Sequence, residues 1–339
     1  MLAVRIHGKG DLRTEQVPDP EPGEGEVRLR TAFVGICGSD LHYLRDGAAG
    51  IFAIREPLIP GHEVSAVVDH DPTGRLAVGT PVTVHPATWG QRQAGLGEDQ
   101  RQLWPRGGYL GSASTWPHTQ GALSELVVVR NDQVRVLPDG LSLERAALAE
   151  PLAVGLHGIA IGGGVVAKRV LVSGSGPIGL LAAAGALARG AAEVVCTDLL
   201  DGPLARATAI GATGTFKIGT DELPDSYFDL TLECAGVPQA LNALLLATRR
   251  AGIIVQVGNL PNDGRQVNLS PLVSKEIQLR GTFRFNTEID DAISLLAQNP
   301  DIARVITHVL AMDRVADAFA VAADSALSGK VLVAVAPSR

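Results

Sequence analysis

Hydrophobic and polar residues alternate in short segments over the first 135 residues of the chain. Residues 26–30 and 81–84 place hydrophobic side chains at alternate positions, residues 66–68 form a short hydrophobic run, and Pro, Gly and Asp separate these segments. A period of two puts hydrophobic side chains on one face of a strand, and the separating residues favour turns. The pattern predicts a β-rich, barrel-like first domain.

A different pattern begins at about residue 168. Hydrophobic residues 170–173 precede a Gly-rich turn, a helix-like run rich in Ala and Leu, and a second hydrophobic segment at 193–197. This order is typical of the βαβ units that build a parallel sheet. We therefore predict an α/β protein whose second domain is a doubly wound parallel sheet. Further strand-like and helix-like segments follow at residues 228–232, 239–249, 252–257 and 277–283.

The change of pattern sets the expected domain limits. A chain of 339 residues is longer than one hydrophobic core usually supports, so two domains are expected. We predict a catalytic domain over residues 1–148, a nucleotide-binding domain over 149–286, and a return to the first domain over 287–339. The helix-like segment 290–298 and the strand-like segment 330–335 belong to the return because they fall outside a six-stranded count.

Charge and composition limit the classes of partner that the protein is expected to bind and indicate the cellular compartment in which it is expected. The 29 Lys and Arg residues are scattered among 36 Asp and Glu residues, and the net charge of −7 argues against a nucleic-acid partner. No segment reaches the ~20 apolar residues of a membrane span, and the N-terminus lacks a signal-peptide pattern. Cys37, Cys196 and Cys234 are few and far apart, which predicts a reducing compartment, the cytoplasm, and no disulfide framework.

The Gly-rich turn has the spacing of a dinucleotide-binding motif. Residues 174–179, Gly-Ser-Gly-Pro-Ile-Gly, lie between the predicted strand and helix in the order G-x-G-x-x-G, with Pro177 and Ile178 inside the motif. Gly174 allows the tight turn, Gly176 lets the backbone approach a pyrophosphate, and Gly179 lets helix and strand pack closely. We predict a Rossmann-type nucleotide site, although a βαβ unit that binds nothing has the same local pattern.

An acidic residue at the end of the next strand specifies the nucleotide. Asp198 follows the hydrophobic segment 193–197, where a carboxylate accepts hydrogen bonds from ribose hydroxyls and repels a 2′-phosphate. This position favours NAD over NADP. Arg206 could instead pair with the 2′-phosphate of NADP. We interpret it as an exposed helix residue, because Asp198 is better placed to contact the nucleotide.

Three residues in the first domain are candidate metal ligands. Cys37 lies between two glycines of a tight turn, and His62 and Glu63 follow Pro60-Gly61 at the edge of a predicted strand. Cys, His and carboxylate are ligand types of zinc, and three protein ligands are typical of a catalytic site. Glu150, at the domain junction, is a candidate fourth ligand or a partner of a zinc-bound water. A buried Cys, a structural His and a surface Glu remain the alternative reading of each residue.

These motifs together resemble the zinc-dependent medium-chain dehydrogenases over nearly the whole chain. Within that superfamily, the segments between His42 and Glu63, 111–121 and 280–285 resemble the sorbitol and L-idonate 5-dehydrogenase branch, and the idonate dehydrogenases in particular. The matching segments are residues 35–43, 60–63, 149–152, 174–179 and 281–285.

The resemblance implies a fold and an assembly. It implies a GroES-like β-rich catalytic domain, a Rossmann domain that holds NAD through the Gly174 turn and Asp198, and a homodimer or homotetramer built through the cofactor domains. It also implies that Cys37, His62 and Glu63 hold one catalytic zinc.

Catalytic roles follow from the same resemblance. Ser39 would contact the reacting hydroxyl, His42 would pass its proton to solvent, and Glu150 would ligate zinc or bind its water. Because His titrates near neutral pH, a relay through His42 is chemically reasonable. A surface histidine on the helix after Cys37 is the alternative.

The chain departs from most relatives in one lobe. Residues 89–104 contain no Cys, whereas most relatives have four closely spaced cysteines there for a second, structural zinc. We therefore expect no structural zinc, and we expect Trp89 and Trp104 to fill the space. Ala66 also stands where Gly is usual, a change that we expect to have little effect.

The expected reaction moves a hydride between NAD and a secondary alcohol of a sugar acid or polyol, as in L-idonate 5-dehydrogenase. A sorbitol, polyol or cyclitol dehydrogenase is the nearest alternative. A sugar acid carries a carboxylate, which Arg binds well, so we expect Arg284, then Arg45 or Arg55, to contact the substrate.

Two other classes of function are weaker alternatives. A zinc-free quinone or enoyl reductase shares the two-domain plan but uses NADPH and lacks the Cys37, His62 and Glu63 set. A nucleotide-sensing protein without catalytic activity would keep the glycine turn and need no metal ligands.

Overall fold

The protein is described from a computed structural model covering residues 1–261 and 264–335. Two compact units emerge from its backbone contacts. The first unit holds Met1–Glu150, Ile306–Asp324 and Lys330–Arg339, of which 336–339 lie outside the described residues. The second unit holds Pro151–Val305 and Ser325–Gly329.

The division differs from the expected limits at the return. It falls inside helix α3 (Ala149–Ile161), and the chain rejoins the first unit at Ile306 rather than at residue 287. The intervening helix α8 (Glu288–Gln298) belongs to the second unit. Two side-chain contacts link α8 to the rest of the second unit: His157 of α3 lies 2.8 Å from Glu288, and Arg189 lies 2.5 Å from Asp291.

The first unit is built on one sheet, which has seven strands among the described residues. Neighbouring strands are antiparallel except β18 and β19, which are parallel. In sheet order the strands are β11 (Val134–Val136), β7 (Pro81–Val84), β6 (Glu63–His70), β3 (Glu26–Gly35), β19 (Lys330–Ala334) and β18 (Ile306–Ala311), and β10 (Leu126–Arg130) also pairs with β3.

Alternating side chains of these strands form the core of the first unit. Val27 and Leu29 of β3 are fully buried and alternate with the half-buried Arg28 and the exposed Arg30, whereas Val64 and Val68 of β6 are buried in a strand whose residues 63–66 are all buried. This arrangement matches the period of two in the sequence. The β-rich first domain is therefore present, and β3 lies at its centre with β6, β10 and β19 as partners.

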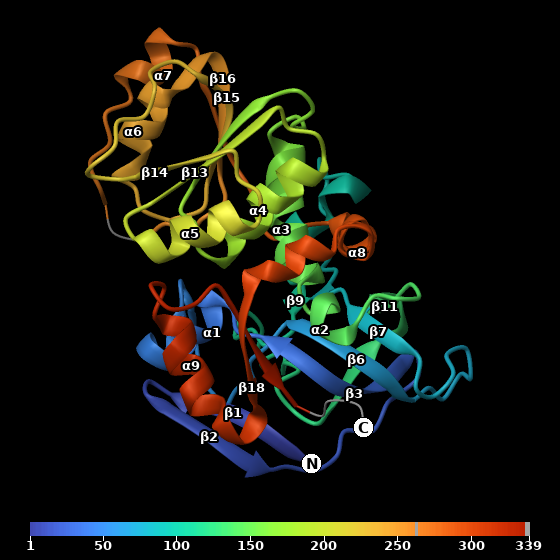
Figure 1. The fold of residues 1–339 in the computed structure, drawn as a ribbon. Helices are drawn as coiled ribbons and strands as arrows, with labels where there is room; N and C mark the ends of the chain where they lie inside the picture. Colours follow the sequence, from blue (N-terminus) through green and yellow to red (C-terminus); the bar gives the residue numbers. More distant parts are fainter. Residues whose placement is uncertain (262–263, 336–339) are drawn as a thin grey trace. The chain divides into compact units, whose positions relative to one another are not determined.

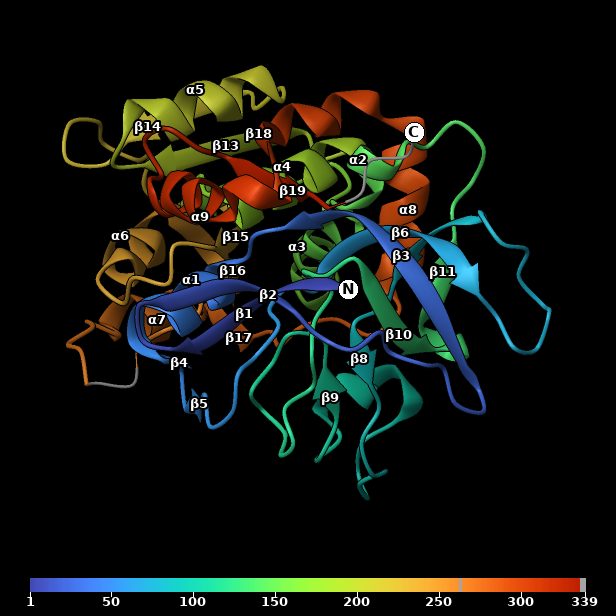
Figure 2. The same ribbon diagram turned by 90° about the horizontal axis from the view of Figure 1, so that it is seen from below.

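Smaller elements complete the first unit (Figure 2). Three two-stranded sheets are formed by β1 (Leu2–Gly8) with β2 (Asp11–Gln16), β4 (Ala48–Ala49) with β5 (Phe52–Ala53), and β8 (Ala87–Thr88) with β9 (Gly108–Tyr109). The helices are α1 (Gly38–Asp46), α2 (Leu143–Ala146) and α9 (Val315–Ala323), and the 3-10 helices are η1 (Glu98–Leu103), η2 (Asn131–Gln133) and η4 (Met312–Arg314).

The second unit is a parallel sheet with helices packed against it (Figure 1). In sheet order its strands are β14 (Gly214–Lys217), β13 (Glu193–Asp198), β12 (Arg169–Ser173), β15 (Phe228–Glu233), β16 (Thr248–Gln256) and β17 (Gln278–Gly281). Besides α3 and α8, its helices are α4 (Pro177–Ala188), α5 (Asp201–Ala209), α6 (Ala240–Ala247), α7 (Ser270–Ser274) and η3 (Pro300–Val305).

The order of these strands reverses between β12 and β15. Strand β12 continues through β13 to β14 on one side, and β15 continues through β16 to β17 on the other. Ligands of open α/β sheets bind at the carboxyl ends of the strands that flank such a reversal. The loops after Ser173 and Glu233 therefore mark the expected nucleotide site. Every helix among the described residues is too short or too polar to cross a membrane.

Candidate functional site

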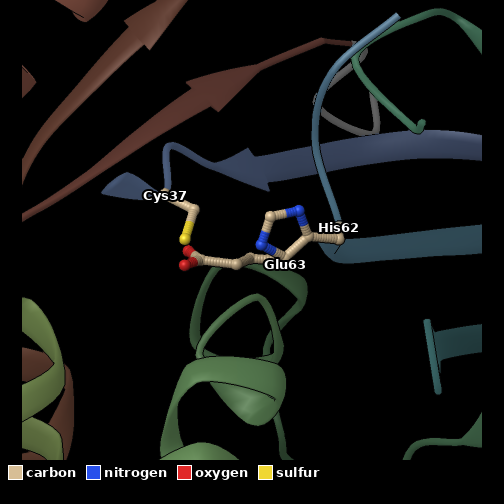
Figure 3. Close-up of side chains that lie close together, drawn as sticks. All are labelled: Cys37, His62 and Glu63. Carbon is tan, nitrogen blue, oxygen red and sulfur yellow. The ribbon is translucent and has the colours of Figure 1, made fainter. Parts of the chain in front are cut away.

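Cys37, His62 and Glu63 come together in the first unit (Figure 3). One ligand atom from each side chain lies within 4.8 Å of the other two. Cys37 caps the N-terminus of α1 just after β3, and Glu63 is the first residue of β6. Because Gly35 of β3 pairs with Glu63 in the antiparallel register, the two segments meet at this point.

A buried carboxylate fixes the two ligand segments to each other. Asp40 accepts a hydrogen bond from the Cys37 backbone N–H at 3.0 Å and from the Gly61 backbone N–H at 3.3 Å. Its side chain is almost fully buried, and burial raises its pKa. Gly61 has a φ of 96°, a conformation that favours glycine immediately before His62.

The two oxygens of Glu63 have different surroundings. Oε1 accepts a hydrogen bond from Lys330 Nζ at 2.6 Å. Oε2 is buried and has no hydrogen-bond partner among the described residues. A Cβ atom at Gly35 would overlap this oxygen, so only glycine leaves room for it. An orphaned carboxylate oxygen beside a thiol and an imidazole fits a metal ligand set.

The charges of the site are strongly coupled. Burial opposes a charged His62, but the nearby Cys37 and Asp40 outweigh burial and raise the pKa of His62 to about 10. Burial also opposes a charged Lys330, but Glu63 and Cys37 raise its pKa.

Glu150 lies near the cluster without belonging to it. Its oxygens fall outside the group of ligand atoms formed by Cys37, His62 and Glu63. Instead, Tyr109 donates its hydroxyl hydrogen to Glu150 Oε1 at 2.5 Å. Burial raises the pKa of Glu150 to about 7, against the lowering effect of a charged His62.

Ser39 and His42 follow Cys37 along α1. They are one turn apart, so they share a face of the helix. Ser39 is half-buried, whereas His42 is exposed and contacts Asp46 at 3.1 Å and Arg45 at 2.9 Å. A side chain at the surface is suited to exchanging a proton with water.

The glycine motif has the expected geometry in the second unit. Gly174 follows β12 with a φ of 88°, and a Cβ there would lie 2.8 Å from Ala235 Cα. A Cβ at Gly179 would overlap the carbonyl oxygen of Gly174, whereas Gly176 faces open space. Helix α4 begins with Pro177 directly after Gly176, and Ile178 lies in its first turn. The steric requirements predicted at Gly174 and Gly179 are therefore present, and the role of Gly176 toward a pyrophosphate stays a prediction.

Asp198 lies next to this turn at the end of β13. Its carboxylate accepts hydrogen bonds from the Ser175 N–H at 3.0 Å and the Leu200 N–H at 3.1 Å. Arg206 is half-buried rather than exposed, and its guanidinium donates to the carbonyl oxygens of Ser325 and Ala326. These bonds occupy Arg206, so Asp198 remains the group placed for a ribose.

A buried glutamate holds the loop that follows β15, the strand that neighbours β12. Glu233, at the end of β15, accepts hydrogen bonds from the N–H groups of Ala235 and Gly236 and from the side chain of Gln256. Sequence reasoning did not identify Glu233, Lys330, Asp40 or Tyr109 as site residues. The available signal was an ionisable residue inside a hydrophobic strand segment, as in residues 228–233 and 330–334.

The three candidate substrate arginines differ in their contacts. Arg45 is paired with Asp46 at 2.7 Å and also contacts His42. The Arg55 guanidinium lies 5.3 Å from the centre of the Trp116 ring. Arg284, in the second unit, lies 4.8 Å from the Phe283 ring.

The lobe at residues 89–104 is packed without cysteine. The Trp89 ring contacts His85 with ring centroids 4.8 Å apart, and the Arg101 guanidinium lies 4.6 Å from its centre. Gln91 N–H donates to the Pro105 carbonyl at 2.9 Å. Trp104 has a buried Nε1 with no partner among the described residues. Aromatic, cation–π and backbone contacts therefore hold this lobe together.

Comparison with known proteins finds a matching protein family for each of the two units. A family described as "Alcohol dehydrogenase GroES-like domain" matches residues 23–139, and one described as "Zinc-binding dehydrogenase" matches residues 177–298. Sorbitol dehydrogenase of Gallus gallus is 36% identical over 338 residues, covering 94% of this chain and 92% of the relative. L-idonate 5-dehydrogenase (NAD(P)(+)) of Escherichia coli K12 is 35% identical over 269 residues, covering 78% of each chain.

The solved structures agree with these matches. The crystal structure of L-idonate 5-dehydrogenase from Escherichia coli has a TM-score of 0.92 and 31% identity, and the match covers 98% of both chains. That of 2R,3R-butanediol dehydrogenase from Bacillus subtilis has a TM-score of 0.88 and 26% identity, over 99% of both chains. The predicted combination of a GroES-like domain and a Rossmann domain is confirmed.

Substitution of Gly35 tests the packing around Glu63. Gly35→Ala places a methyl group where Glu63 Oε2 lies, so we expect Glu63 to be displaced and bound zinc to fall well below that of the wild type. Gly38→Ala is the matched control, because a Cβ there meets no atom within 4 Å. Elemental analysis of both purified variants makes the measurement. Equal zinc content in the two variants would contradict this account.

The raised pKa of Glu150 makes a second prediction, for the metal-free protein. Between about pH 4.5 and 7, folded Glu150 keeps a proton that the unfolded chain has lost, so its contribution to stability falls as pH rises. Relative to Glu150→Gln, the wild-type free energy of unfolding should therefore decrease over this range. Urea unfolding at several pH values measures the difference. A constant difference would show that Glu150 titrates normally.

Proposed function

Because the chain belongs to the zinc-binding alcohol dehydrogenase family that includes sorbitol dehydrogenase, we propose that it transfers a hydride between NAD and a secondary alcohol of a sugar acid or polyol, most closely as L-idonate 5-dehydrogenase does. The observation that carries this proposal is the convergence of Cys37, His62 and Glu63. The same chain carries the glycine turn and Asp198 of a dinucleotide site.

Cys37, His62 and Glu63 would hold one zinc ion, with Glu150 beside it. Bound zinc supplies a Lewis acid that lowers the pKa of an alcohol hydroxyl. Glu63 offers the free oxygen Oε2, and Asp40 keeps the Cys37 and His62 segments in register. Glu150, hydrogen-bonded to Tyr109, would hold a water or the fourth coordination position.

The chain also supplies a route for the substrate proton. Ser39 would accept the proton from the reacting hydroxyl, and His42 would release it to water from the exposed face of α1. Asp46 contacts Nδ1 of the His42 ring at 3.1 Å and would orient the ring. Bound NAD would supply the hydride acceptor for the substrate carbon.

We propose NAD rather than NADP as the cofactor. Asp198 places a carboxylate beside the glycine turn, where it would accept the ribose hydroxyls and repel a phosphate. The Arg206 guanidinium donates hydrogen bonds to the carbonyl oxygens of Ser325 and Ala326. Pro177 and Ile178 begin the helix whose N-terminus would face the pyrophosphate.

The substrate class rests on the relatives and on arginine. Sorbitol and L-idonate 5-dehydrogenase are both among the similar proteins, so a polyol or cyclitol substrate is the nearest alternative. Arg284 would bind the carboxylate of a sugar acid, and Arg55 is the next candidate. A zinc-free quinone or enoyl reductase is disfavoured because it would have no use for the clustered ligands.

Assembly and location extend the proposal. We propose a homodimer or homotetramer formed through the second unit, whose edge strand β17 exposes Leu279 and is followed by the half-exposed Phe283. We propose one zinc per chain, because the lobe at 89–104 lacks cysteine. Cys37, Cys196 and Cys234 are free, as is typical of a reducing compartment, for which we propose the cytoplasm.

A substrate panel tests the proposed reaction. The wild type should reduce NAD with L-idonate faster than with sorbitol, xylitol or myo-inositol, and Cys37→Ala should abolish activity because a zinc ligand is lost. Cys196→Ala removes a buried thiol outside the cluster and should keep activity. Absorbance at the nicotinamide band records the rates. Activity that survives in Cys37→Ala would exclude the zinc mechanism.

The same panel isolates the role of Arg284. Arg284→Ala should raise the KM for L-idonate roughly tenfold and leave the KM for sorbitol unchanged, because only the acid carries a carboxylate. Arg250→Ala, which alters an arginine bonded to the Ser274 carbonyl in the same unit, is the control. An equal rise in the KM for both substrates would contradict the proposed role of Arg284 in binding the carboxylate.

Cofactor choice is tested at Asp198. Asp198→Ala should raise the KM for NAD by roughly tenfold and lower that for NADP, because the ribose acceptor and the repulsive charge are both removed. Asp201→Ala changes an exposed acid of α5 that pairs with Lys217 and should alter neither. Initial rates with each cofactor make the comparison. Unchanged preference in Asp198→Ala would refute this role.

A further inference from the structure

A fully buried lysine contacts the candidate metal site. Lys330 Nζ donates to Glu63 Oε1 at 2.6 Å and to the Ile36 carbonyl oxygen at 3.1 Å. The exposed fractions of the two side chains are 1% for Lys330 and 0% for Glu63. Lys330 begins β19, which pairs with β3 directly before Cys37. No part of the proposed reaction uses this lysine.

A cation at this position needs a physical reason. A positive charge hydrogen-bonded to one ligand oxygen repels a metal cation bound to the other, so Lys330 weakens rather than strengthens metal binding. Without a metal, however, the Glu63 carboxylate is fully buried against Lys330, and Glu150 is a second buried carboxylate in the same unit. Unpaired buried charges are very costly, and removing one partner of a buried pair is strongly destabilising.

We propose that Lys330 is a positioning residue that acts as a built-in counter-ion of the empty metal site. It balances the charge of Glu63 while no metal is bound, and it occupies Oε1 so that Oε2 alone is left for the metal. The inference rests on the proposed zinc site. It assigns to Lys330 a cost in metal affinity and a gain in stability of the metal-free protein.

The proposal separates a counter-ion from a lysine that merely fills space. In Lys330→Met, the metal-free protein loses the balancing charge, whereas the zinc-loaded protein still has the metal to balance Glu63. The metal-free melting temperature should fall by roughly 10 °C, and the zinc-loaded one by less than half as much. By thermodynamic linkage, the folded variant should bind zinc at least about tenfold more tightly than the wild type.

A matched lysine provides the control. Lys275 is also nearly buried, and its Nζ donates to Asp225 and to the carbonyl oxygens of Leu245 and Thr248 in the second unit. Lys275→Met should lower the melting temperatures of the metal-free and zinc-loaded proteins equally. It should leave the zinc dissociation constant unchanged.

The experiment measures thermal unfolding and zinc affinity of the full chain. Wild type, Lys330→Met, Glu63→Gln and the double variant are melted with a chelator and with saturating zinc, and dissociation constants come from competition with a chromophoric chelator. Glu63→Gln removes the charge that Lys330 balances. The double variant should therefore recover most of the metal-free stability lost in Lys330→Met, and it remains informative if Lys330→Met alone does not fold.

The outcomes distinguish failure of the counter-ion role of Lys330 from failure of the proposed zinc site. Equal loss of stability in both metal states, weaker zinc binding by Lys330→Met, or no recovery in the double variant would overturn the counter-ion role. Failure of the wild type to gain stability from zinc would instead refute the proposed zinc site, independently of how Lys330→Met behaves in the chelator.

Discussion

The antiparallel pairing of Gly35 with Glu63 brings together two segments that carry the candidate ligands. Because β3 ends at Gly35 and β6 begins at Glu63, Cys37 and His62 lie just beyond the paired residues. Glycine at position 35 leaves the space that Glu63 Oε2 occupies. The geometry of the ligands thus depends on the sheet, and the buried core of β3 and β6 stabilises it.

Electrostatics imposes a second constraint on the same place. The ligand set and its neighbours are mainly acidic and are buried, so the fold must supply hydrogen bonds and positive charge to accommodate them. Asp40 accepts hydrogen bonds from backbone N–H groups, Glu150 accepts one from the Tyr109 hydroxyl, and Glu63 accepts one from Lys330. At Glu63, Lys330 occupies Oε1 and leaves Oε2 without a hydrogen-bond partner among the described residues.

Local sequence patterns predicted those parts of the molecule that depend on local geometry. The glycine motif predicted a strand, a turn and a helix because each glycine answers a short-range steric requirement, as at Gly174 and Gly179. The two-domain fold class and the family were also predicted and are confirmed. The roles of Ser39, His42 and Arg284 stay predictions.

Long-range contacts were beyond the reach of the sequence. Lys330 and Glu63 are 267 residues apart, and no local sequence pattern predicts that their side chains make contact. The return of the chain was expected at residue 287, but the second unit continues to Val305 and includes α8, which contacts His157 and Arg189 of that unit. Hydrophobic periodicity says which face of a helix is buried and does not say against which partner.

The amount of zinc bound per chain, measured by elemental mass spectrometry on protein purified without added metal chelators, tests the central claim most directly. The account predicts close to one zinc per chain in the wild type and almost none in Cys37→Ala. Absence of zinc from carefully purified wild-type protein, or the same zinc content in Cys37→Ala, would contradict it.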